Sequence, residues 1–89
     1  MAIISFTPNL LRHVEIPSVR IAGSTVRRVL EGYFREYPRV RGYVLDDQGA
    51  VRRHVAIFLN GELIRDRAGL SDAVGGNDEI FVAQALSGG

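Results

Sequence analysis

The chain has 89 residues, of which 46% are hydrophobic and 24% are charged. This length and composition predict one globular domain that folds without disulfides or a structural metal. There is no cysteine, which excludes a thiol nucleophile, a zinc–cysteine site and a redox pair. The sequence also lacks a secretory signal and the run of about 20 apolar residues that a membrane span requires. We therefore expect a cytoplasmic protein without membrane contact.

The formal net charge at pH 7 is +1, and all 11 basic residues are arginine. A dedicated nucleic-acid surface requires a clustered basic stripe and a higher net charge, so no nucleic-acid partner is expected. The two adjacent pairs, Arg27-Arg28 and Arg52-Arg53, both have acidic residues nearby, as in a solvated face of mixed charge. Because lysine is absent, the side chains of this protein could not accept an isopeptide bond, and the chain could serve only as the carboxyl donor.

Two strands are predicted at the start of the chain. Residues 2–7 are rich in β-branched and aromatic side chains, and Pro8-Asn9 marks a turn after them. A second strand is predicted over residues 14–21. Pro17 cannot donate to a neighbouring strand, so this second strand is expected at a sheet edge or with a bulge.

Residues 24–37 carry the pattern of an amphipathic helix. Apolar side chains recur there at helical spacing, and they are Val26, Val29, Leu30, Tyr33, Phe34 and Tyr37. Ser24 or Thr25 is the expected N-cap, and Pro38 is expected to end the helix.

The second half of the chain is predicted to be mostly extended. Residues 39–49 have a weak pattern and are expected to form a connecting loop with one helical turn. A third strand is predicted over residues 53–59. Asn60-Gly61 is a strong signal for a two-residue hairpin loop that returns into residues 62–64.

The last predicted elements complete the order of strands and helices from which the fold class is inferred. Residues 70–74 are expected to form a short turn of helix, and the last strand is predicted over residues 79–83. The order of elements favours an α+β fold, a β-grasp, in which a mixed sheet of four to five strands has one main helix (residues 24–37) on one face. The first and last strands would lie parallel in its centre, joined by the helical crossover. We expect residues 1–84 to form this domain and residues 85–89 a flexible tail.

The sequence contains no convincing catalytic or metal-binding constellation. His13 and His54 are the only histidines, and two distant imidazoles without cysteine make a poor metal set. Asp46-Asp47 is typical of a turn rather than of paired acid–base carboxylates. Gly75-Gly76 precedes a predicted strand, whereas a phosphate-binding loop precedes a helix. We expect no catalytic residue, no metal and no cofactor bound by this chain.

The tail Leu86-Ser87-Gly88-Gly89 follows closely on the last predicted strand. Glycine has no Cβ, so such a tail could run through a tunnel too narrow for side chains and bring the Gly89 carboxylate into another protein. A carboxylate is a poor electrophile, but an acyl-adenylate made with ATP by a partner enzyme can be attacked by sulfur. The product would be a thiocarboxylate, which can donate sulfur. A frayed chain end is the alternative interpretation.

A partner would also need an exposed apolar surface near the tail. If Ile80 faces the helix, alternation leaves Phe81 and Ala83 on the opposite face of the sheet. They would adjoin Ala56 and Phe58 if the two strands are neighbours. We predict that these four residues bind a partner, and the alternative is that the phenylalanines are ordinary core or lone exposed aromatics.

Several features together resemble the ubiquitin-like sulfur-carrier family. They are the order of elements, the Asn60-Gly61-Glu62 hairpin, the Asn77-Asp78-Glu79-Ile80 entry into the last strand and the Ser87-Gly88-Gly89 end. This family includes the thiamine-pathway carrier, the molybdopterin synthase small subunit and the cysteine-pathway carrier. The resemblance spans the whole chain. It implies a β-grasp fold, adenylation of Gly89 by an E1-like enzyme, conversion to a thiocarboxylate and delivery of sulfur to a biosynthetic enzyme.

The type of carrier is predicted from two further segments. The long connection over residues 39–53 and the run over residues 54–62 look more like cysteine-pathway or molybdopterin-type carriers than the shorter thiamine carrier. Gln84-Ala85 stands where prolines are common in molybdopterin-type tails, so a cysteine-type pathway is favoured. The small subunit of molybdopterin synthase is the alternative. A ubiquitin-like binding module without activation and a protein tag are further alternatives.

Overall fold

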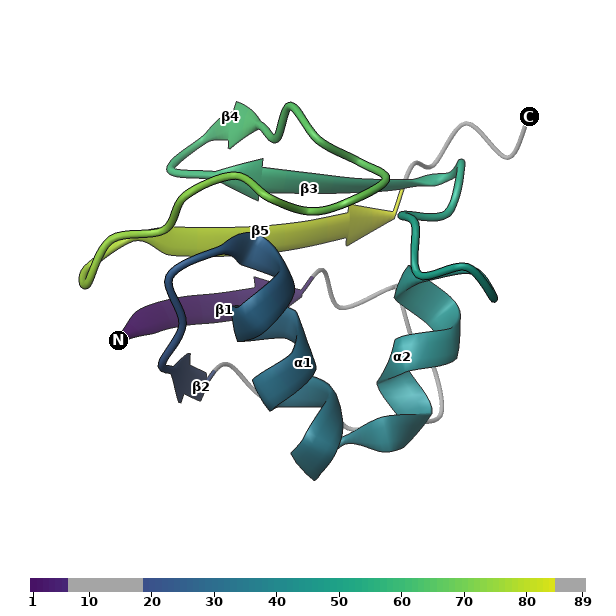
Figure 1. Cartoon of the computed structure of the whole chain (residues 1–89), viewed down its shortest axis with the longest axis horizontal. Helices are drawn as coiled ribbons and strands as arrows, with labels where there is room; N and C mark the ends of the chain where they lie inside the picture. The colour runs from purple at the N-terminus through teal and green to yellow at the C-terminus, as the bar shows by residue number, and fades with distance from the viewer. Residues whose placement is uncertain (7–18, 85–89) are drawn as a thin grey trace.

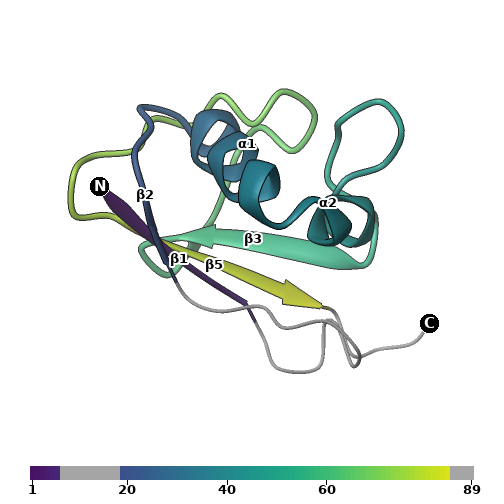
Figure 2. The same cartoon turned by 90° about the horizontal axis from the view of Figure 1, so that it is seen from below.

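A five-stranded mixed sheet carries two helices on one of its faces (Figures 1 and 2). The computed structural model describes residues 1–6 and 19–84. The elements in chain order are β1 (Ala2–Phe6), β2 (Val19–Ile21), α1 (Val26–Glu36), α2 (Pro38–Val44), β3 (Val55–Leu59), β4 (Glu62–Leu63) and β5 (Glu79–Gln84). The strand order across the sheet is β2-β1-β5-β3-β4.

The first and last strands lie side by side in the sheet. β1 and β5 are parallel, with Ile4 opposite Ile80, and the other neighbouring strands are antiparallel. A parallel pair needs a crossover connection, and α1 belongs to that connection here. The predicted α+β fold of the β-grasp type, with its mixed sheet and main helix, is confirmed.

The core lies between the sheet and the helices. Alternate residues of the three longer strands point into it, and those that are buried are Ala2, Ile4, Phe6, Val55, Ile57, Ile80 and Val82. They meet the apolar stripe of α1, whose buried members are Val26, Val29, Leu30, Tyr33 and Phe34. The rings of Phe6 and Tyr33 pack with their centroids 4.8 Å apart. Burial of each of the larger apolar side chains stabilises the fold by about 1.5–3 kcal/mol.

Both ends of α1 form where the sequence predicts them. Thr25 is the N-cap, and its Oγ1 accepts a hydrogen bond from the Arg28 amide at 3.2 Å. At the other end, the Tyr37 amide donates to the Tyr33 carbonyl before Pro38 ends the helix. The predicted N-cap and the predicted end are therefore confirmed.

The N-terminus of α1 is closed by a segment from the far half of the chain, residues 65–74. The Val26 amide donates to the Asp72 carbonyl at 3.0 Å, and the Arg27 amide donates to the Leu70 carbonyl at 2.9 Å. The first amides of a helix have no partner within the helix itself. The 65–74 segment supplies acceptors for two of them.

The prediction of a helical turn over residues 70–74 is wrong. Leu70 has a φ of +56°, in the left-handed region, while its side chain is fully buried. The Val74 amide donates to the Ser24 carbonyl. The backbone of this stretch bonds to the start of α1 instead of to itself, and this long-range pairing overrides the local helical pattern.

Two carboxylates hold the 65–74 segment in shape. Asp66 accepts hydrogen bonds from the Ser71 hydroxyl at 2.6 Å and from the Gly69 amide at 2.8 Å. Asp72 accepts from the Arg65 and Asp66 amides, both at 2.9 Å. These bonds favour the charged form and lower the pKa of both carboxyl groups, chiefly through Ser71 for Asp66 and through Arg65 for Asp72.

Residues 39–49 are predicted to be a loop with one helical turn, but the first part of this range belongs to α2. Pro38 ends α1 but also occupies the first turn of α2, where a missing amide costs nothing. Val40 and Val44 are four residues apart, so both reach the core from one face of α2, and both are fully buried. The proline therefore separates two helices rather than a helix and a loop.

The strands differ from the predicted ranges at their ends. β2 is described only from Val19, so Pro17 lies outside the described residues, but β2 does lie at a sheet edge as expected. β3 begins at Val55 rather than at Arg53. The Asn60-Gly61 hairpin is confirmed, with positive φ at both residues.

We expect Gly42→Ala in α2 to raise the free energy of unfolding by about 0.5–1 kcal/mol, because alanine favours a helix and no atom lies within 4 Å of the new Cβ. Gly32→Ala is the matched variant in α1. Its Cβ would stand 2.7 Å from Ile21 Cγ2, so the same gain should be cancelled or reversed. Urea denaturation measures both, and equal stabilisation by the two substitutions would contradict this packing of α1 on β2.

We expect Asp66→Asn to destabilise the protein at neutral pH and to lose this effect in acid. The folded-state pKa of Asp66 lies below its ordinary value of 3.8, so its stabilisation is complete above the unfolded-state pKa and disappears as the pH falls through the folded-state pKa. Thermal denaturation over a pH series should show the gap between wild type and variant narrowing below pH 3.8. A gap that stays constant into strong acid would rule out the carboxylate's role.

Candidate functional site

The face of the sheet opposite the helices carries an apolar row that crosses three strands. Phe58 of β3 lies opposite Leu63 of β4 on one side and Phe81 of β5 on the other. Leu63 is 60% exposed and Phe81 is 41% exposed, while Phe58 is half-buried between them. We call these three residues the docking row. They are neighbours across adjacent strands, and Figure 2 shows both described helices on the other face of the sheet.

The four residues predicted to bind a partner do share this face. Ala56 pairs with Ala83 in the row next to Phe58 and Phe81, as expected if β3 and β5 are neighbours. Both alanines are half-buried. Their small side chains leave Phe81 as the most exposed of the four.

Leu63 is a member of this surface that the sequence prediction missed. Its position follows from the Asn60-Gly61 loop, because a two-residue hairpin fixes the register of the strands that it joins. Leu59 then pairs with Glu62, and Phe58 pairs with Leu63. The signal was therefore present in the sequence.

β5 connects this face to the predicted tail. Its last residue, Gln84, lies opposite Val55 at the end of the sheet. The predicted tail of residues 85–89, with Leu86, Ser87, Gly88 and Gly89, lies outside the described residues. The role predicted for Gly89 therefore stays a prediction.

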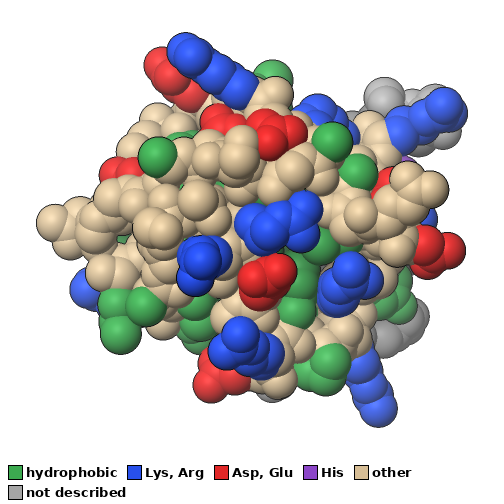
Figure 3. Space-filling view, in the orientation of Figure 1, with side chains coloured by type: hydrophobic (Ala, Val, Ile, Leu, Met, Phe, Trp, Pro, Cys, Tyr) green, Lys and Arg blue, Asp and Glu red, His purple; other side chains and the backbone are tan. Residues whose placement is uncertain are grey.

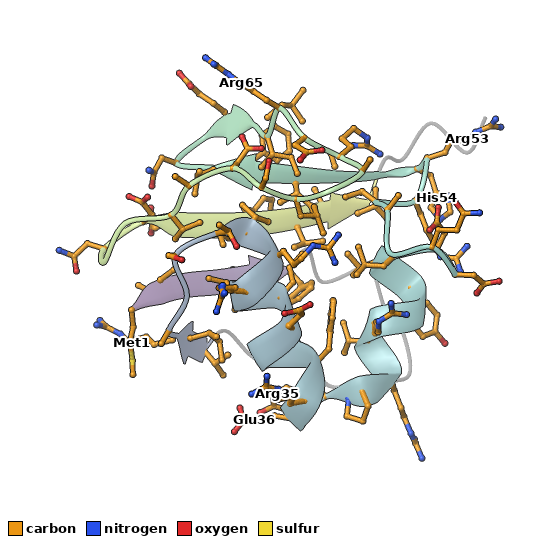
Figure 4. The ribbon with its side chains drawn as sticks, viewed as in Figure 1. Met1, Arg35, Glu36, Arg53, His54 and Arg65 are labelled. Atoms are coloured by element: carbon orange, nitrogen blue, oxygen red, sulfur yellow. The ribbon has the colours of Figure 1, made fainter. Side chains whose placement is uncertain are left out.

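No group of three or more histidine and carboxylate side chains that could hold a metal is present in residues 1–6 and 19–84. His54 is exposed in the turn before β3. Figure 4 shows His54 and Arg53 at the end of the molecule opposite Met1. His13 lies outside the described residues.

Asp46 and Gly75, both singled out in the sequence, have structural partners. Asp46 Oδ1 accepts from the Gln48 and Ala50 amides at 2.9 and 3.0 Å, which is turn chemistry as predicted. The Gly75 amide donates to the Asp78 carboxylate at 2.6 Å.

Burial, with a contribution from the neighbouring Tyr37, raises the pKa of Tyr33 to about 12. The Tyr33 hydroxyl therefore stays protonated at neutral pH and cannot act as a base.

The helices of the described ranges are too short or too polar to cross a membrane. α1, the longest of them, has 11 residues, and a span needs about 20.

Comparison with known proteins gives one family and several solved structures. The sequence model of the ThiS family matches residues 12–89. No match was found among curated proteins.

The solved structures are similar over nearly their whole length. CysO of Mycobacterium tuberculosis, described as an antigen, is 25% identical with a TM-score of 0.81, over 97% of this chain and 100% of that one. The solved structure of a BexX–CysO complex from Amycolatopsis orientalis contains a matching chain with 22% identity and a TM-score of 0.82. The match covers 100% of this chain and 100% of that one. SAMP1 of Haloferax volcanii gives 23% identity and a TM-score of 0.75, over 99% of this chain and 98% of that one.

Proposed function

The chain belongs to the ThiS family, which confirms its predicted membership of the ubiquitin-like sulfur carriers, and we propose that Gly89 is the residue that carries the sulfur. An E1-like enzyme adenylates Gly89 with ATP, a sulfur donor turns the adenylate into a thiocarboxylate, and a biosynthetic enzyme accepts the sulfur. The chain acts as a co-substrate of these enzymes. The observation that carries the proposal is that the family match extends through Gly88-Gly89.

The chemistry requires a free carboxylate on Gly89. A carboxylate oxygen attacks the α-phosphorus of ATP, and pyrophosphate leaves. A hydrosulfide or persulfide sulfur then attacks the acyl carbon, and AMP leaves with the electron pair of the broken C–O bond. Hydrosulfide gives the thiocarboxylate directly. A persulfide gives an acyl disulfide, and a thiol then attacks its outer sulfur, breaks the S–S bond, forms a new disulfide and releases the thiocarboxylate. Glycine suits this position because no side chain crowds the reacting carbon. No second residue of this chain takes part in the bond changes.

The docking row supports the proposal because its member Phe81 lies on β5, the strand that leads to the predicted tail. A fully extended segment of five residues spans at most about 17 Å, so Gly89 can reach no farther than that from the end of β5. An enzyme that binds Phe58, Leu63 and Phe81 therefore has the carboxylate within reach of its own active site. Exposed apolar rows of this kind mark interaction sites.

We propose a cysteine-type pathway for the sulfur, on the sequence of the 39–53 connection and the absence of proline at Gln84-Ala85. The likeness to two proteins named CysO is in keeping with this choice. Co-purification with a molybdopterin synthase large subunit would select the alternative role of small subunit. Lysine-linked adducts on other proteins would select the role of a protein tag.

Incubation with ATP, a sulfide source and the cognate activating enzyme should increase the intact mass by the difference between sulfur and oxygen. The increase should map to the peptide that contains Gly89. Deletion of Gly89 should abolish the modification and leave the thermal unfolding midpoint unchanged, because Gly89 lies outside the predicted domain of residues 1–84. An unchanged mass with every activating enzyme of the source cell would refute the proposed function.

Phe81→Asp should raise the KM of the activating enzyme for this chain by about tenfold or more, as expected for an interface anchor. Its kcat should change less, because the side chain of Phe81 takes no part in the bond changes at Gly89. Tyr43→Asp on α2 is the matched control, since Tyr43 is 51% exposed but lies on the helix side of the sheet. Equal effects of the two substitutions on KM would show that the docking row is not the contact surface.

A further inference from the structure

A hollow surface lies on the helix side of the molecule, away from the docking row. It is a groove of about 400 Å³ between α1 and α2, and its lining residues are Arg27, Glu31, Phe34, Arg35, Arg41 and Leu45. We call it the arginine groove. Figure 3 shows basic side chains around an acidic one on this face, with hydrophobic atoms visible between them.

One guanidinium of the groove is fixed by the 65–74 segment. Arg27 Nε donates to the Gly69 carbonyl at 2.8 Å, and Arg27 Nη1 lies 4.0 Å from a carboxylate oxygen of Glu31. This arginine is therefore held in place before any ligand arrives. Its guanidinium partly neutralises the charge of Glu31, the one acidic residue among those that line the groove.

The other two guanidinium groups are available to a ligand. Arg35 and Arg41 are exposed, and neither guanidinium makes a hydrogen bond or ion pair with another residue of the described ranges. Figure 4 shows Arg35 at the outer end of α1. Arginine binds carboxylates through two parallel N–H donors, so an unpaired arginine at a groove rim is suited to acidic side chains.

The base of the groove is apolar. Phe34 is 6% exposed and Leu45 is 5% exposed, so each presents only an edge to the groove. A bare inorganic anion would leave these apolar atoms uncovered. An occupant that covers them needs an apolar side chain between its charges.

A smaller hollow extends the charged surface along α1. It has about 320 Å³, shares Glu31 and Arg35 with the groove and adds Arg28. Four arginines and one glutamate therefore line the two hollows together. The whole chain has a net charge of only +1, so the positive charge is concentrated on this face and the remaining side chains are net negative.

We propose that the arginine groove binds an acidic segment of a partner protein, in which carboxylates flank an apolar side chain. The carboxylates pair with Arg35 and Arg41, and the apolar side chain rests on Phe34 and Leu45. A nucleic acid fits less well, because Glu31 stands among the arginines and would face the phosphates. A protein segment can place its apolar side chain beside Glu31 and its charges elsewhere.

This surface lies on the other side of the sheet from the docking row, so two partners can bind the chain at the same time. The inference does not depend on Gly89. Its test needs neither an activating enzyme nor a thiocarboxylate, and the proposed function can fail without affecting it.

The test is an NMR titration of the ¹⁵N-labelled protein with a blocked peptide in which aspartates and glutamates flank a leucine. Saturable shifts are expected at the amides of Gly32, Arg35, Arg41 and Leu45, with none at the docking row. Replacing the acids of the peptide by their amides should weaken binding by about tenfold or more. The same loss is expected for the protein variant Arg35→Glu with Arg41→Glu.

Matched variants separate the groove from general charge. Arg53→Glu with Arg65→Glu makes the same change of charge at two exposed arginines that Figure 4 shows away from the groove, and it should bind the peptide as wild type does. Arg35→Gln with Arg41→Gln removes the charge without reversal and serves if the first variant does not fold. Full binding by the groove variant overturns the proposal. Tighter binding of inorganic phosphate or of a single-stranded oligonucleotide at the same amides also overturns it.

Discussion

The arrangement of this molecule depends on the hydrogen bonds that close the N-terminus of α1. The amides of Val26 and Arg27 lie over the core, where an unsatisfied donor would cost about 1–3 kcal/mol. The carbonyls of Leu70 and Asp72 satisfy them. This contact joins the helix to the connection between β4 and β5 and fixes α1 on one face of the sheet. The left-handed backbone at Leu70 is the cost of aiming a carbonyl at the helix while its side chain stays in the core.

With both helices fixed on one face, no helix of the described residues covers the other face of the sheet, and strand alternation determines which side chains lie on that face. On β5, Ile80 and Val82 are buried under the helices, so Phe81 between them must point outward. The same strand leads to the predicted tail, and it is bonded on both sides, by β1 and by β3. Under the proposed function, a partner that binds Phe81 would hold the strand that leads to residues 85–89, so recognition and presentation of the Gly89 carboxylate would depend on the same strand.

Features that depend on local periodicity could be predicted from the sequence, whereas those that depend on distant backbone partners could not. The stripe from Val26 to Tyr37, the Asn60-Gly61 hairpin and the outward position of Phe81 follow from spacing alone. The conformation of the 65–74 segment does not, because its bonding partners are the first residues of α1, some 40 positions earlier. Pro38 is an ambiguous signal for a different reason, because proline can follow the end of one helix and also occupy the first turn of the next. The arginine groove could not be predicted either, because Arg41 lines it together with Arg27 only when residues 38–44 form α2. The sequence predicted a loop there.

The use of arginine at every cationic position is consistent with a chain that carries an activated acyl group. A lysine amine could capture such a group as an amide, whereas the guanidinium stays protonated at neutral pH and is not a nucleophile. Met1 has an α-amine that could also capture such a group. It donates to the Gly76 carbonyl at 2.7 Å, at the end of the sheet where β5 begins, and because β1 and β5 run parallel, β5 carries the chain away from it. Under the two proposals, arginine would supply both the charge for binding a partner and side chains that do not react with the activated Gly89 acyl group.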